Sequence, residues 1–130
     1  MWQRIQTVFL LIAAIAAIAF IFLPVGENEI FFKVMDDTIT AAISVATGLL
    51  SLFTITQFRN RKLQIRMCML IVLFALVMII SAYFQVNNLS YQPLYHFLAG
   101  VPIVIIISAL LARRNIKKDD ALVRSMDRFR

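Results

Sequence analysis

The sequence predicts an all-α membrane protein in which four transmembrane helices form an up-down bundle, followed by an amphipathic cytoplasmic C-terminal helix. Three observations support this fold class. Hydrophobic residues make up 62% of the chain and charged residues 15%, whereas a soluble domain has about 45–50% and about 25%. Four long runs contain no Asp, Glu, Lys or Arg, and short polar segments separate them. Lysine and arginine gather in alternate polar segments, as they do when a chain is threaded through a membrane.

The composition also limits the classes of partner. A chain of 130 residues with a mean hydropathy of +0.86 has more apolar surface than a soluble core of this size can cover, so we expect the lipid bilayer as its solvent. The net charge of +6 would suggest nucleic acid in a soluble protein. Here the cations flank apolar runs and form no nucleic-acid-binding module, so no nucleic-acid partner is expected.

The first predicted span covers residues 5–23. It has about 19 residues, which matches the ~30 Å thickness of bilayer hydrocarbon at 1.5 Å per residue. Alanines between residues 13 and 17 suit close helix contact, and Pro24 ends the run. A cleaved signal peptide with Arg4 as its basic region is the alternative, but the apolar run continues to Leu23 and favours a span.

An acidic segment, residues 25–38, follows the first span. It is expected to be a solvated external loop whose last residues cap the next helix. A cation site is the alternative for its four carboxylates, but they lack the spacing of an EF-hand.

The second predicted span, residues 39–58, differs from the others because small and hydroxyl residues recur along it every three or four positions. Residues at that spacing share one helix face, where they let backbones approach closely and form hydrogen bonds across helices. A polar pore lining is the alternative for this face. The expected helix-packing residues are Thr40, Ser44, Thr47, Gly48 and Ser51.

A cationic segment, residues 59–66, separates the second span from the third, residues 67–84. Four cations in eight residues predict a tight cytoplasmic turn. The fourth span is expected over residues 94–112, so the transmembrane domain covers residues 1–112 and a basic cytoplasmic tail covers 113–130. Eight cations near the spans are expected to fix the topology and to contact anionic inner-leaflet lipids. They are Arg59, Arg61, Lys62, Arg66, Arg113, Arg114, Lys117 and Lys118.

The tail has the pattern of an amphipathic helix. Leu122, Met126 and Phe129 fall on one face, and Asp120 and Arg124 form an i,i+4 pair. This predicts a helix that continues the fourth span or lies along the inner leaflet. Docking of a membrane protein partner, or of a second copy in a homo-oligomer, on the apolar face is the alternative.

The cations also predict the orientation. Twelve of the thirteen Lys and Arg residues fall in the amino-terminal segment, the cationic segment and the tail, and only Lys33 falls on the opposite side. This bias places both termini in the cytoplasm. It requires an even number of spans, in agreement with the four apolar runs.

Three polar stretches resemble a known family: residues 1–7 (MWQRIQT), 60–66 (NRKLQIR) and 117–128 (KKDDALVRSMDR). The chain resembles a bacterial family of small membrane proteins described as domain of unknown function 4293. The resemblance covers essentially the whole chain and implies four spans and a bacterial inner-membrane location. The family has no assigned activity, so the resemblance transfers no functional residue.

The sequence bears on three classes of function. A non-enzymatic scaffold or accessory subunit of a membrane complex agrees best with a charge-free interior and an amphipathic tail. A small transporter or channel subunit for a neutral or poorly charged solute is the alternative. Proton-coupled export is not expected, because it needs an intramembrane carboxylate and the predicted spans have none. No enzyme is expected, since one histidine, His96, and one cysteine, Cys68, at opposite interfaces provide no catalytic, cofactor-binding or metal-binding set. Cys68 is interpreted as a packing residue.

Overall fold

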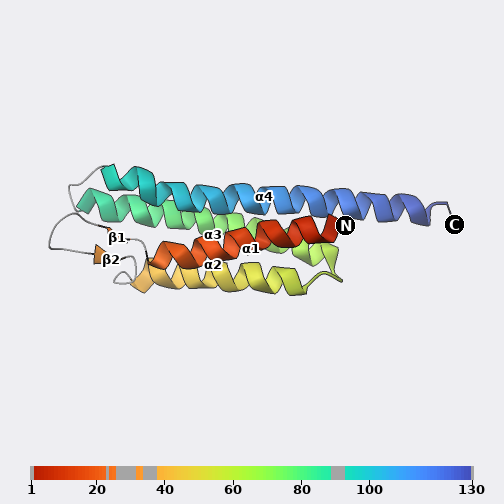
Figure 1. Ribbon diagram of the computed structural model, residues 1–130, viewed down its shortest axis with the longest axis horizontal. Coiled ribbons are helices and arrows are strands. Elements are labelled where there is room, and N and C mark those ends of the chain that lie inside the picture. The colour runs from red at the N-terminus through yellow and green to blue at the C-terminus, as the bar shows by residue number, and fades with distance from the viewer. Residues whose placement is uncertain (1, 23, 26–31, 34–37, 89–92, 130) are drawn as a thin grey trace.

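The computed structural model describes residues 2–22, 24–25, 32–33, 38–88 and 93–129 (Figure 1). Four helices contain most of these residues, so the prediction of an all-helical chain with four helices is confirmed. A two-residue antiparallel ladder, in which Pro24 pairs with Lys33 and Val25 with Phe32, was not predicted. The elements in order are α1 (Trp2–Ile21), β1 (Pro24–Val25), β2 (Phe32–Lys33), α2 (Thr38–Thr56), α3 (Arg61–Asn88) and α4 (Pro93–Asp127).

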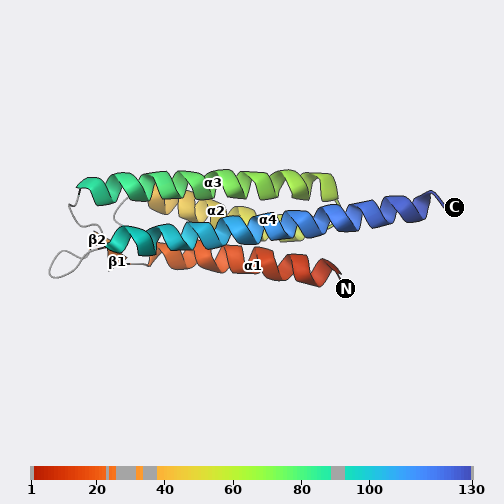
Figure 2. The same ribbon diagram turned by 90° about the horizontal axis from the view of Figure 1, so that it is seen from above.

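The helices run up and down along one common axis (Figures 1 and 2). α1 packs against α2 and α4, and α3 packs against the same two helices. The start of α1, the α2–α3 turn and the far end of α4 all lie at one end of the bundle, which we call the cationic end (Figure 2). The β1–β2 ladder lies at the opposite end.

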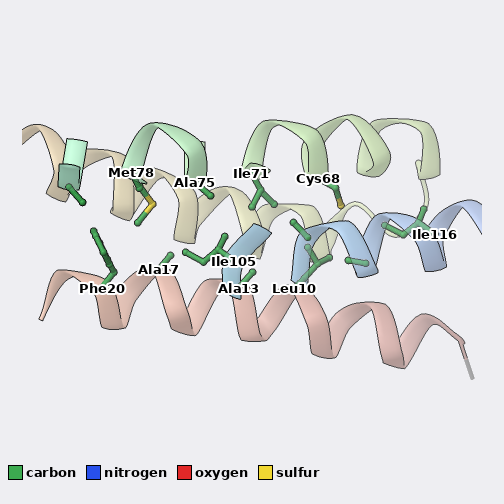
Figure 3. Packing of buried hydrophobic residues seen from close by; sticks show 13 residues of the cluster. Leu10, Ala13, Ala17, Phe20, Cys68, Ile71, Ala75, Met78, Ile105 and Ile116 are labelled. Atoms are coloured by element: carbon green, nitrogen blue, oxygen red, sulfur yellow. The ribbon is translucent and has the colours of Figure 1, made fainter. Parts of the chain in front are cut away.

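Small side chains allow this close packing. Figure 3 shows Leu10 and Phe20 of α1 pointing inward towards Ile71 and Met78 of α3 and Ile105 of α4. Alanines fill much of the remaining core, where a larger side chain would separate the helices. The buried alanines of this cluster are Ala13, Ala17, Ala75, Ala82, Ala109 and Ala112.

Many large aliphatic side chains point outward, although others such as Leu10, Ile71 and Ile105 fill the core. Ile15 is 65% exposed and Leu49 is 63% exposed, and large apolar side chains are exposed on each of the four helices. Extensive apolar surface of this kind marks contact with a membrane or with another protein. By length and composition, two of the described helices are able to cross a membrane, over Thr38–Thr56 and Arg61–Phe84, and Ile5–Ile21 is a shorter apolar helix. Only 33% and 28% of the most apolar windows of the two longer helices are buried, so neither resembles the mostly buried core helix of a soluble protein.

The turn between α2 and α3 includes only part of the cationic segment. The chain turns at residues 57–60, and α3 begins at Arg61, so the prediction of a turn over residues 59–66 is wrong for its last six residues. Those residues are mostly good helix formers. Asn60 caps the helix, because its Oδ1 accepts a hydrogen bond from the Leu63 N–H at 3.3 Å.

α4 continues without interruption from the predicted fourth span into the predicted tail. It has 35 residues and runs through Pro102. Beyond the other three helices it projects along the bundle axis (Figures 1 and 2). Of the two arrangements predicted for the tail, the structure therefore has the continuous helix.

Candidate functional site at the cationic end and the hydroxyl face of α2

The hydroxyl face of α2 lies against α1 and α3. Each of the five predicted packing residues is buried, and Thr54 joins them. Exposed Val45, Leu49 and Phe53 occupy other positions of the same helix. The helix therefore directs its polar and small residues inward and its large apolar residues outward. The buried set is Thr40, Ser44, Thr47, Gly48, Ser51 and Thr54.

Two of these hydroxyls form bonds across helices. The Ser44 hydroxyl donates to the Ala17 carbonyl of α1. The Thr40 hydroxyl donates to the Ser81 hydroxyl of α3 at 3.1 Å. Thr40 and Ser44 thus connect α2 to both of its neighbours, as their four-residue spacing predicted.

The remaining hydroxyls bond mainly within α2. Thr47, Ser51 and Thr54 donate to the carbonyl four residues earlier, at 2.7, 2.8 and 2.7 Å. The Thr47 hydroxyl also lies 3.8 Å from the Met78 sulfur of α3. Hydroxyls satisfied by their own helix are buried without needing a partner from another element.

Gly48 lies where α2 meets α1. A Cβ built on Gly48 would lie 3.5 Å from Ile18 Cγ1 and 3.9 Å from both the Ala14 carbonyl oxygen and Ala17 Cβ. These are ordinary contacts for one methyl group, but they leave no room for a longer side chain. The close approach explains why a small residue occupies this position.

The eight predicted headgroup cations surround the cationic end. Arg59, Lys62 and Arg66 from the turn and the start of α3 are exposed, as are Arg114, Lys117 and Lys118 of α4. The Arg59 guanidinium lies 6.0 Å from the centroid of the Phe58 ring, within the range of a cation–π contact. An open groove of about 550 Å³ at this end is lined by Phe58, Arg59, Asn60, Arg61, Lys62 and Asp120.

Arg61 and Arg113 differ from the other cations because they are half-buried. Arg61 Nη2 lies 3.3 Å from Asp119 Oδ2, and Arg61 Nη1 donates to the Asp119 carbonyl at 3.5 Å. This pair joins the first turn of α3 to the extension of α4. The sequence identified Arg61 only as a topology residue, because its partner lies 58 positions away.

Two buried glutamines near this pair were not predicted as site residues. Gln6 of α1 and Gln64 of α3 are each only 5% exposed. The Gln64 amide donates to the Thr54 carbonyl at 3.3 Å and so connects α3 to α2. An uncharged glutamine beside an apolar run was the only sequence signal for either residue.

The tail presents its apolar face to solvent. Leu122, Met126 and Phe129 are 49%, 69% and 92% exposed. The predicted pair on the tail is confirmed, because Arg124 Nη2 lies 3.1 Å from Asp120 Oδ2. The extension therefore has an unpartnered apolar face in this structure of a single chain.

Cys68 lies fully buried in the hydrophobic cluster, where it packs like a small apolar residue. The His96 side chain and the carboxylates of the acidic segment fall outside the described residues. Within the described part of the chain, no three His, Cys, Asp or Glu residues form a group able to hold a metal ion.

Comparison with protein families gives one match that covers nearly the whole chain. The family model described as Domain of unknown function (DUF4293) matches residues 2–129. The chain belongs to this family. No curated protein and no solved structure matches this DUF4293 chain.

Proposed function

We propose that this DUF4293 protein is a four-span protein of the bacterial inner membrane that acts as a non-enzymatic scaffold or accessory subunit of a membrane complex. The observation that favours this function is the extension of α4. It projects past the other helices and exposes an apolar face at Leu122, Met126 and Phe129.

The outward apolar surface supports insertion of all four helices in lipid. α2 and α3 are long enough to cross a bilayer. α1 contributes the apolar stretch Ile5–Ile21, and α4 exposes Ile103, Ile107 and Leu110. Each helix thus offers large aliphatic side chains to its surroundings, which lipid accommodates and water does not.

The distribution of charge supports a cytoplasmic location for the cationic end. The exposed cations of the α2–α3 turn and of α4 lie together there, while Lys33 lies in β2 at the opposite end. Cations next to spans are retained on the cytoplasmic side. Both termini are then cytoplasmic.

The direction of α4 favours a protein partner over the lipid surface. The extension continues along the bundle axis (Figures 1 and 2), so in a membrane it points away from the inner leaflet instead of lying on it. Residues 113–130 contain seven cations and three acids. We propose that the partner is an amphipathic cytoplasmic helix of a neighbouring membrane protein, with acidic residues beside its apolar stripe.

Topology reporters and a membrane wash test the membrane part of this proposal. A reporter fused after Glu29 is expected in the periplasm and one fused after Lys62 in the cytoplasm. The protein is expected to stay in the membrane fraction during an alkaline wash. Two reporters in the same compartment, or release by alkali, would refute the four-span arrangement.

Purification after mild crosslinking in cells tests the partner. A stoichiometric membrane protein is expected with the full chain, and it is lost when residues 121–130 are removed. The comparison variant is Lys117→Gln with Lys118→Gln, which removes two cations that would face the partner's acidic residues and keeps the apolar face, so a smaller loss is expected. Loss with the comparison variant but not with the truncation contradicts docking on the apolar face.

Transport of a neutral solute along the hydroxyl face of α2 has less support. The hydroxyls of Thr40, Ser44 and Thr47 form hydrogen bonds to other groups of the bundle, so a passing solute would have to break those bonds. Solute flux in liposomes that falls on Ser44→Leu, with no partner recovered from cells, would favour transport over the scaffold.

A further inference from the structure

A small polar cavity lies at the cationic end, where all four helices meet. Its volume is about 30 Å³. Such a volume has room for one water molecule and not for an organic ligand. Its lining comes from α1 (Gln6, Thr7), α2 (Ile55), the turn after it (Phe58), α3 (Arg61, Gln64) and α4 (Asp119).

Gln6 indicates that this cavity has an occupant. The residue is 5% exposed, and its Nε2 has no hydrogen-bond partner among the described residues. An amide N–H that is buried without an acceptor destabilises the folded state. The geometry therefore calls for an acceptor beside Gln6.

The rest of the lining identifies the chemistry of that acceptor. Asp119 offers carboxylate oxygens, and Gln64 offers an amide oxygen because its nitrogen already donates to Thr54. A bound anion would lie beside the Asp119 carboxylate, and a bound cation beside the Arg61 guanidinium and the Gln6 N–H. A water molecule both accepts and donates, so it suits this mixed lining.

We propose that the cavity binds one structural water, which accepts a hydrogen bond from Gln6 Nε2 and donates to oxygens of Asp119 and Gln64. The water connects α1, through Gln6, to Gln64 of α3 and Asp119 of α4. Together with the Arg61–Asp119 pair it positions the start of the α4 extension. This inference is independent of the scaffold role.

Nuclear magnetic resonance on the full chain in lipid nanodiscs tests the water directly. The protein is labelled with ¹⁵N-glutamine, and the Gln6 side-chain signal is identified by its disappearance in Gln6→Met. A dipolar cross-peak between that amide and a long-lived water is expected. Absence of this cross-peak in the wild-type protein overturns the proposal.

Thermal unfolding gives a second test, because the direction of the change in Tm distinguishes a cavity that holds water from a dry one. Gln6→Met keeps the length of the side chain but breaks the bond to the water, so the Tm is expected to fall by about 5 °C. Gln57→Met in the turn after α2, where the half-buried side chain does not line the cavity, is the matched control and leaves the Tm unchanged. In a dry cavity the same Gln6→Met removes an unpaired donor, so an unchanged or raised Tm overturns the proposal.

Exchanging the anion in the buffer tests whether the cavity holds a water molecule or a halide ion. At constant ionic strength, replacing chloride by bromide or gluconate is expected to leave the Tm of the wild-type protein unchanged. A Tm that follows the halide shows an anion site instead and overturns the water assignment.

Discussion

Enlarging Gly48 tests whether the hydroxyl face of α2 determines the packing of the bundle. A methyl group at this position reaches ordinary contact, 3.5 Å from Ile18 Cγ1. Gly48→Ala is therefore expected to fold normally, with a Tm equal to or slightly above that of the wild type, because alanine favours a helix over glycine. The three further carbons of Gly48→Leu must enter space that α1 occupies.

The size of the effect follows from overpacking. Inserting carbons into a well-packed core destabilises a protein by about 1–3 kcal/mol. For a chain of this length that corresponds to a fall in Tm of about 3–15 °C. Ala14 and Ala17 contribute a backbone oxygen and a Cβ to the contact, and neither moves unless α1 moves, so we expect the upper part of this range.

Ala46→Leu is the matched control for Gly48→Leu. Ala46 lies on the same helix two residues earlier and is exposed, so the same leucine points into lipid or detergent there. Thermal unfolding in nanodiscs, followed by circular dichroism, compares the variants. A Gly48→Leu Tm equal to that of wild type, or an equal loss for Ala46→Leu, would refute the reasoning that α1 and α2 meet at this glycine.

Three further predictions concern an ion pair, the hydroxyls of α2 and an exposed aromatic ring. A double-mutant cycle of Arg61→Gln and Asp119→Asn is expected to give a coupling energy of about 1 kcal/mol in chemical unfolding, because the pair is partly shielded from solvent; a coupling near zero shows that the pair does not hold α4. Ser44→Ala is expected to lower stability by about 0.6 kcal/mol through the lost bond to α1, and Ser51→Ala, whose hydroxyl bonds its own helix, by less; equal losses contradict this assignment. Phe129→Ser is expected to leave the Tm unchanged, since the ring is 92% exposed, and to abolish recovery of the partner after crosslinking; retained recovery contradicts docking on this face.

The sequence predicted features that repeat along one helix. The hydroxyl face of α2 was found because small polar residues at a spacing of four are conspicuous in an apolar run, and the structure buries all five residues named from it. The i,i+4 pair of Asp120 and Arg124 was found for the same reason. The spacing of residues along one helix shows which of them share a face, whatever the positions of the neighbouring helices.

Contacts between distant parts of the chain were missed. The pairing of Arg61 with Asp119 and the burial of Gln6 beside Gln64 depend on the register of three different helices. Hydropathy does not determine that register, since the apolar spans tolerate a shift along their axes. The start of α3 at Arg61 does not follow from charge density, because arginine and lysine are frequent in turns beside apolar runs and are also good helix formers.

The unbroken length of α4 has a mechanical consequence. At 1.5 Å per residue, its 35 residues form a rod about 52 Å long. Thinning or thickening of a bilayer changes the tilt of the helices within it, and a rotation of about 10° about one end of such a rod displaces the other end by about 9 Å. In the proposed membrane arrangement, the tip near Phe129 would thus amplify small changes in lipid thickness into movements large enough for the proposed cytoplasmic partner to detect.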